Sequence, residues 1–277
     1  MDASNPIKPA EPIDALLTAV RARTPARVLA GRSGTAYRTA TLLELRHDHA
    51  FAADAVHAEL DLERDFGKTF VEHWNLFEVT TLANSKAEYL LRPDLGRRFP
   101  ESARAQVVER CPAEVVFQVV IGDGLSAAAV RAQVAPLLLL LGAEAGRRGW
   151  RFGQPFVVRH CRVGVLNEIG DLLRPELVVL LIGERPGLAT AESLSAYLAY
   201  RPRAGHTDAN RNLISNIHAR GIPPPVAAPR IAALAAKLQS LKTSGIQVKE
   251  ELPLQAPNFI SVPEQCLLAS QSLPEGE

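Results

Sequence analysis

The chain has few aromatic residues and almost no net charge, and each shortage excludes a class of function. Aromatic side chains make up 5% of its 277 residues, too few for a surface that stacks nucleic-acid bases. A formal net charge of +1 gives no basic field to draw the protein to nucleic acid or an anionic membrane. The longest apolar run, around Val134 to Leu141, is far too short to span a bilayer. We therefore expect neither a nucleic-acid partner nor a membrane.

Cysteines are also scarce. Cys111, Cys161 and Cys266 are isolated, odd in number and in no CxxC arrangement, which argues against a disulfide framework or a structural zinc site. No charged segment followed by an apolar stretch opens the sequence, so we do not expect secretion. Reduced thiols in the cytoplasm are the simplest interpretation.

Motifs for metal binding and hydrolysis are missing as well. His47, His49 and His57 lie near Asp48 and Asp54, but two histidines two residues apart point to different sides of a helix. We therefore predict polar contacts there and no metal site. No GxSxG segment supplies a serine nucleophile for hydrolysis.

What the sequence does contain, from residue 106 onward, is a repeated strand–helix pattern. Apolar runs predict strands at 115–121, 155–158, 177–182 and 213–217. Helical periodicity or capping predicts helices at 126–141, 164–173, 192–200 and 231–241. Strands that alternate with helices in this way predict an α/β fold, a Rossmann-like parallel sheet with helices on both faces.

The region before this pattern is predicted to be mostly helical. Apolar spacing indicates one helix at 13–20 and another from Thr39 or Thr41 to Leu60. We divide the chain into an N-terminal tail and helical region (1–105), the Rossmann-like domain (106–250) and a proline-containing C-terminal tail (251–277).

One charged residue stands where such folds bind ligands. The apolar run 178–182 ends at Gly183, which delivers Glu184 to the carboxyl end of the strand. Glu184 either pairs with its neighbours or solvent, or accepts hydrogen bonds from a polar ligand with amide or hydroxyl donors. Because it has no partner acid, acid–base catalysis by this chain alone is not expected.

Two other segments have a structural and a functional interpretation. Residues 122–126, Gly-Asp-Gly-Leu-Ser, lack the third glycine of a dinucleotide site and a following Walker lysine, so a tight turn capped by Ser126 is favoured over a phosphate cradle. Arg92, Arg97 and Arg98 with Asp94 form either a solvated loop or a protein interface, and we leave both open.

Ten short blocks of the chain stand out together. They are TPAR at 24–27, GRSG at 31–34, DHA at 48–50, DAV at 54–56, RPDLGRR at 92–98, DGLSA at 123–127, RVGV at 162–165, LLIGERPGL at 180–188, SL at 193–194 and ISNI at 214–217. In order and spacing, over roughly residues 13–245, they resemble the small subunit (light chain) of ethanolamine ammonia-lyase, an adenosylcobalamin enzyme, and LLIGERPGL followed by ISNI is the specific pair.

The resemblance implies a Rossmann-like domain that covers the corrinoid at the interface with a large TIM-barrel subunit. It implies that Val163, Glu184 and Leu213 contact the adenosylcobalamin and that the catalytic residues lie on the large subunit. Leu213 departs from the family, which usually has cysteine before ISNI; we favour a contact through backbone or apolar bulk, which leucine also provides. The sequence lacks an Asp-x-His-x-x-Gly segment, which fits a cofactor that keeps its own base on cobalt.

The reaction that the resemblance implies converts ethanolamine to acetaldehyde and ammonia by a radical mechanism. It also implies a bacterial microcompartment as the location, with the cytoplasm otherwise, although residues 1–11 lack the amphipathic face of an encapsulation peptide. Two alternatives remain: a stand-alone Rossmann-fold enzyme with a nucleotide cofactor, and a purely structural subunit without cofactor contact.

Overall fold

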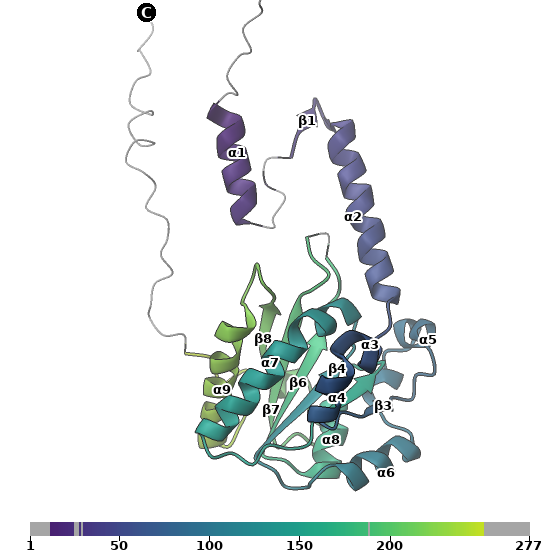
Figure 1. The fold of residues 1–277 in the computed structure, drawn as a ribbon, viewed down its shortest axis with the longest axis vertical. Coiled ribbons are helices and arrows are strands. Elements are labelled where there is room, and N and C mark those ends of the chain that lie inside the picture. Colours follow the sequence, from purple (N-terminus) through teal and green to yellow (C-terminus); the bar gives the residue numbers. More distant parts are fainter. Residues whose placement is uncertain (1–11, 25–27, 29, 188, 252–277) are drawn as a thin grey trace, which may run out of the picture.

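The computed structural model describes residues 12–24, 28, 30–187 and 189–251 (Figure 1). The tail predicted at 1–11, nearly all of the tail predicted at 251–277, and Cys266 therefore lie outside the described residues.

A six-stranded mixed sheet forms the centre of the fold. In spatial order its strands are β3 (Glu78–Thr80), β5 (Phe156–Arg159), β4 (Phe117–Gly122), β6 (Leu177–Gly183), β7 (Leu194–Tyr200) and β8 (Asn212–Ile217). The first four are mutually parallel, whereas β7 is antiparallel to both β6 and β8. Since two reversals restore the direction, β8 runs the same way as β6, and only β7 is reversed.

The structure corrects two sequence predictions about this sheet. The helix predicted at 192–200 is strand β7, which pairs with β6 at seven consecutive positions, so the sheet is not parallel throughout. Alanine and leucine favour helix locally, but Leu194, Ala196 and Leu198 alternate onto one buried face and pairing with β6 outweighs that preference. The second correction is β3, a three-residue strand from the predicted helical region, too short to show periodicity. The Rossmann-like description stays a prediction.

Helices cover both faces of the sheet. On one face lie α7 (Ala127–Arg147) and α9 (Pro224–Leu241), packed on Val119 and Val179; on the other lie α6 (Glu101–Arg110) and α8 (Val165–Leu173), packed on Val120 and Val178. Neighbouring residues of β4 and β6 thus enter two different cores. This explains their uninterrupted apolar sequence, which is typical of strands buried on both sides.

Helix α7 by itself is long and apolar enough to cross a membrane, which the shorter run within it did not suggest. It has 21 residues, and 50% of its most apolar window is buried inside the protein. Its buried side chains, among them Val130, Val134 and Leu138, belong to the core between α7 and the sheet. The apolar composition of α7 is therefore explained by that core.

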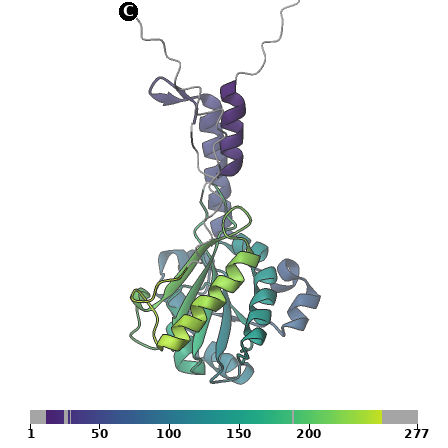
Figure 2. The same ribbon diagram turned by 90° about the vertical axis from the view of Figure 1, so that its left-hand side faces the viewer.

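The first described residues form an arm that extends from this body. It contains α1 (Pro12–Arg23), the two-residue strands β1 (Arg32–Ser33) and β2 (Ala36–Tyr37), and α2 (Thr39–His57). Figures 1 and 2 show the arm rising from the same end of the molecule as the loop between β6 and β7. Both predicted helices of this region are confirmed.

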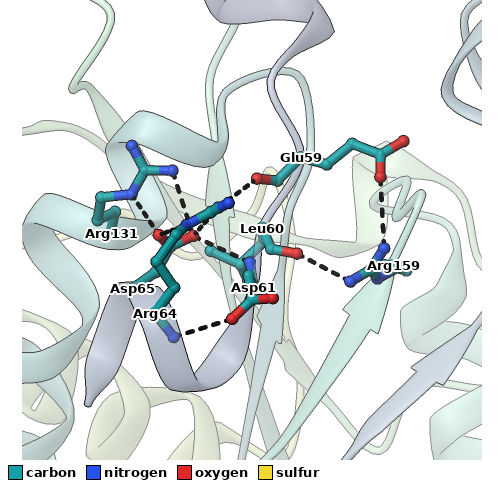
Figure 3. Close-up of polar contacts among 7 residues, drawn as sticks. All are labelled: Glu59, Leu60, Asp61, Arg64, Asp65, Arg131 and Arg159. Carbon is teal, nitrogen blue, oxygen red and sulfur yellow. Dashed lines mark hydrogen bonds and ion pairs between the residues drawn. The ribbon is translucent and has the colours of Figure 1, made fainter.

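A charged cluster attaches the chain after the arm to the sheet domain. Helices α3 (Leu62–Phe66) and α4 (Lys68–His73) follow α2, and Asp65 on α3 binds Arg64 at 2.8 Å and Arg131 of α7 at 2.9 Å (Figure 3). Nearby, Arg159 of β5 donates to the carbonyl of Leu60 at 2.8 Å. The remaining short elements are α5 (Lys86–Leu91) and the 3-10 turns η1 (Leu95–Arg97) and η2 (Asp208–Asn210).

Candidate functional site

The loops that follow β4, β5 and β6 meet at the carboxyl edge of the sheet. Asp123, just after β4, is buried, and its carboxylate accepts hydrogen bonds at 2.9 Å from the backbone N–H groups of His160 and Cys161, which follow β5. β5 and β6 lie on opposite sides of β4, so the chain changes direction across the sheet at this point. Open α/β sheets bind ligands in the crevice at such a switch point.

The Gly-Asp-Gly turn after β4 is a packing device. Gly124 has φ +56°, and a Cβ there would lie 2.4 Å from the carbonyl oxygen of Gly183. The Leu125 N–H donates to that same oxygen at 3.1 Å, while the Ser126 side chain caps α7 by accepting from the Ala129 N–H at 3.2 Å. The predicted tight turn is confirmed. The Gly183 carbonyl at the end of β6 fills the space beside Gly124 and accepts the Leu125 N–H. The turn therefore offers no support for a nucleotide phosphate site.

Glu184 is held in a fixed orientation by strands β7 and β8. The hydroxyl of Ser195 donates to Oε1 and that of Ser193 to Oε2, both at 2.8 Å, and the Asn216 N–H donates to Oε1 at 2.9 Å. The predicted local pairing thus exists, but it does not saturate the carboxylate. Each oxygen has two acceptor positions, so one remains on Oε2, and the serine oxygens keep their own acceptor capacity.

A cavity of about 270 Å³ opens beside Glu184, and we call it the rim cavity. Residues from four segments line it: Leu125 after β4, Val163 after β5, Glu184 after β6, and Ser195 and Tyr197 on β7. Two of the three sequence-predicted residues, Val163 and Glu184, therefore share one cavity. The loops that carry these two residues are separate in the sequence, and they come together only because the strand ends converge.

A larger cavity of about 1020 Å³ adjoins the first, and we call it the arginine cavity. Arg162, Val163 and Tyr197 line both cavities, and Leu213 lines the larger one. Leu213 is 46% exposed and pairs with Tyr197 in the middle of β7, so it lies along the sheet face rather than at the rim with Glu184. The structure thus places the three predicted residues around two adjoining cavities.

Sequence reasoning missed several residues of this site. Ser193 and Ser195 were hidden by the helix prediction, although a spacing of two is typical of side chains on the same face of a strand. Tyr197, half-buried between the cavities, was missed for the same reason. Burial raises the pKa of its hydroxyl, with the charges of Asp208 and Glu184 acting in the same direction, so this hydroxyl stays protonated and able to donate.

The histidines and thiols among the described residues form no second centre. Within the described ranges no three His, Cys, Asp or Glu side chains come close enough to hold a metal ion. Cys111 and Cys161 are buried free thiols, and burial raises the pKa of Cys111 to about 12 and that of Cys161 well above its usual value. Neither thiol is suited to act as a nucleophile near neutral pH.

Comparisons with known proteins show which family the chain resembles. A family model described as ethanolamine ammonia-lyase light chain (EutC) matches residues 14–249. The small subunit of ethanolamine ammonia-lyase from Clostridium perfringens is 40% identical over 230 residues, which are 83% of this chain and 76% of that protein. The Clostridium acetobutylicum small subunit is 37% identical over 233 residues, 84% of this chain and 94% of that protein. The match covers the arm, the sheet and both cavities, and the chain belongs to the ethanolamine ammonia-lyase light-chain (small-subunit) family.

Proposed function

We propose that this chain is the small subunit of an adenosylcobalamin-dependent ethanolamine ammonia-lyase, which converts ethanolamine to acetaldehyde and ammonia. In this proposal the carboxyl edge of the sheet covers the corrinoid where the chain meets the large TIM-barrel subunit. The observation that carries it is a pair of adjoining cavities, one at this edge and one beside it along the sheet, in a chain of this family; Val163 lines both, Glu184 the first and Leu213 the second.

The donors and acceptors at the edge fit a corrinoid. A corrin ring carries many neutral side-chain amides, which need both hydrogen-bond acceptors and donors. Glu184 has a free acceptor position on Oε2, and Tyr197 supplies a protonated hydroxyl. Because Ser193 and Ser195 already fix the carboxylate, binding a ligand there costs little additional side-chain entropy.

When bound, adenosylcobalamin supplies the radical chemistry by homolysis of its cobalt–carbon bond. The residues of this chain hold and orient the cofactor, and they exclude water from the covered face. Glu184 is engaged with two serines and a backbone N–H, so in this proposal it binds the cofactor and does not transfer protons. The proposal therefore assigns catalysis to the large subunit and no catalytic residue to this chain.

Exposed apolar side chains support a partner subunit. Leu43 and Phe51 on α2 are 58% and 60% exposed, and Leu213 beside the arginine cavity is 46% exposed. Large apolar groups at such positions are typical of surfaces that become buried in an assembly. The bacterial microcompartment, with the cytoplasm as the alternative, stays a prediction from the family resemblance.

The test is an equilibrium titration of the reconstituted two-subunit complex with adenosylcobalamin. We expect Glu184→Ala to weaken cobalamin binding about tenfold, the worth of one hydrogen bond to a charged group, while the subunits still co-elute. Glu184→Gln keeps the shape and one acceptor, so it should retain more affinity. Glu192→Ala is the matched control, because Glu192 is exposed in the same loop and outside both cavities. Equal affinity of Glu184→Ala and the unmodified complex would remove Glu184 from the site.

A further inference from the structure

The arginine cavity has an excess of positive charge. Five arginines and three carboxylates line it, so positive charges exceed negative ones by two when His206 is neutral. All three carboxylates are engaged: Glu168 with Arg104, Asp208 with Arg211, and Asp171 with the Ala204 N–H at 3.1 Å.

Three of these arginines make no close ion pair. Within the part of the chain that the structure describes, no carboxylate forms a salt bridge with Arg97, Arg98 or Arg162, although the charge of Arg97 helps to lower the pKa of Asp94 nearby. The Arg162 guanidinium lies over the ring of Tyr89, 4.2 Å from its centroid, and donates only to the Tyr89 carbonyl at 3.3 Å. Unpaired guanidinium groups in a shared cavity repel one another, so an anion between them would be favourable.

Close packing restricts the orientation of the Arg97 and Arg162 side chains. A Cβ at Gly164 would lie 2.8 Å from Cγ of Arg97, and a Cβ at Gly96 would lie 2.7 Å from Cγ of Arg162. The aliphatic stems of both arginines therefore rest on glycine backbone, which limits where their charged ends point. This geometry differs from that of freely rotating surface arginines.

A fourth arginine adds a buried, incompletely bonded group to the cavity wall. The Arg211 side chain is 5% exposed, and it binds Asp208 and, at 3.0 Å, Asn167. Its Nε has no hydrogen-bond partner among the described residues. Burial lowers the pKa of Arg211; the ion pair with Asp208 opposes this shift, and the charge of Arg97 adds to it. A buried donor of this kind is costly unless a ligand or water satisfies it.

We propose that the arginine cavity, through Arg97, Arg98 and Arg162, binds the phosphodiester of the cobalamin nucleotide loop. This inference rests on the proposed function. The corrin amides are neutral and suit the rim cavity, whereas the nucleotide loop carries the one phosphate of the cofactor and suits the adjoining arginines. Guanidinium groups bind phosphate oxygens through paired N–H donors, and the N-terminus of α8 at Gly164 adds a favourable dipole.

The experiment compares two corrinoids on the reconstituted complex of both subunits. Adenosylcobalamin carries the nucleotide loop, and adenosylcobinamide lacks it together with its phosphate. We expect the double variant Arg97→Ala/Arg98→Ala to bind adenosylcobalamin about tenfold or more weakly and adenosylcobinamide with unchanged affinity. Raising the salt concentration should weaken adenosylcobalamin binding to the unmodified complex more than to the double variant.

Two further variants test whether the positive charge is what matters and whether it must lie in the cavity. Arg97→Lys keeps the positive charge and should retain most of the affinity that Arg97→Ala loses. Arg92→Ala is the matched control, because Arg92 lies in the same loop, is exposed and pairs with Asp94 outside the cavity. It should bind both corrinoids as the unmodified chain does.

Three other outcomes would count against the proposals, and they can be told apart. An equal loss for both corrinoids would overturn the phosphate assignment and leave the proposed function standing. Loss of co-elution with the large subunit in the double variant, with co-elution retained in Arg97→Lys, would show that the arginines pair with carboxylates of that subunit, which also overturns it. Failure of the unmodified complex to bind either corrinoid would instead reject the proposed function.

Discussion

The substitution Asp65→Asn tests how the arm is attached to the sheet domain. The Asp65 side chain is 2% exposed, and it accepts from Arg64 and Arg131, whose side chains are 62% and 44% exposed (Figure 3). Burial by itself raises the pKa of this carboxyl, but hydrogen bonds from Arg64, the Asp61 backbone and Arg131 outweigh it and hold that pKa well below its usual range. The substitution keeps the shape and removes the charge.

We expect the free energy of unfolding to fall by about 2 kcal/mol at pH 7, within the range for hydrogen bonds to a charged group. A larger loss is not expected, because both arginines regain water when the charge is removed. For a chain of this size the melting temperature should fall by about 4–8 °C. Since the folded-state pKa is depressed, the ionised carboxylate stabilises the protein fully above the unfolded-state value of about 4, and this contribution disappears as the pH falls through the folded-state value.

The assay is urea unfolding followed by the fluorescence of Trp74 and Trp150, which both pack against the core. Asp94→Asn is the control, because Asp94 is 58% exposed in its pair with Arg92 and should change stability by less than about 0.5 kcal/mol. The reasoning fails if Asp65→Asn unfolds like the unmodified chain at pH 7. It fails equally if the difference between the two proteins is undiminished at pH 3.

Two further predictions concern buried groups of the sheet domain. Burial raises the pKa of Cys111 to about 12 and that of Cys161 well above its usual value, so we expect iodoacetamide at pH 8 to modify these thiols only after unfolding. Rapid alkylation of either thiol in the native protein, detected by peptide mass spectrometry, would contradict this. Gly183→Ala should destabilise the fold by about 2–3 kcal/mol in the same urea assay, because its Cβ would lie 2.0 Å from the Ser126 carbonyl oxygen. Gly146→Ala on α7, with nothing within 4 Å of its Cβ, should instead be neutral or stabilising; the same effect for both would refute the clash argument.

Elements that depend on local patterns were predictable from the sequence. The apolar runs gave β4, β5 and β6 to within a residue or two, and Ser126 was identified as the cap of α7. The position of Glu184 at the sheet edge was also predictable, since a glycine that ends a buried strand places the next side chain there. The family resemblance named Val163 and Leu213 beside it.

Strand β7 and everything attached to it were not predictable in this way. Its alanine and leucine residues favour helix, and only pairing with β6 on one side and β8 on the other makes it a strand. The helix prediction therefore concealed the serines that orient Glu184 and the tyrosine between the cavities.

The sequence by itself determined which segments form the apolar strands, where α1, α2, α7 and α8 begin, and the family to which the chain is related, because these follow from the order of neighbouring residues. The tertiary structure decided that one strand is reversed and that Ser193 and Ser195 hold Glu184. It also decided that Arg97, Arg162 and Arg211 face one cavity. These three residues lie on segments that are distant along the chain, and no local pattern records which distant segments the sheet and its loops bring together.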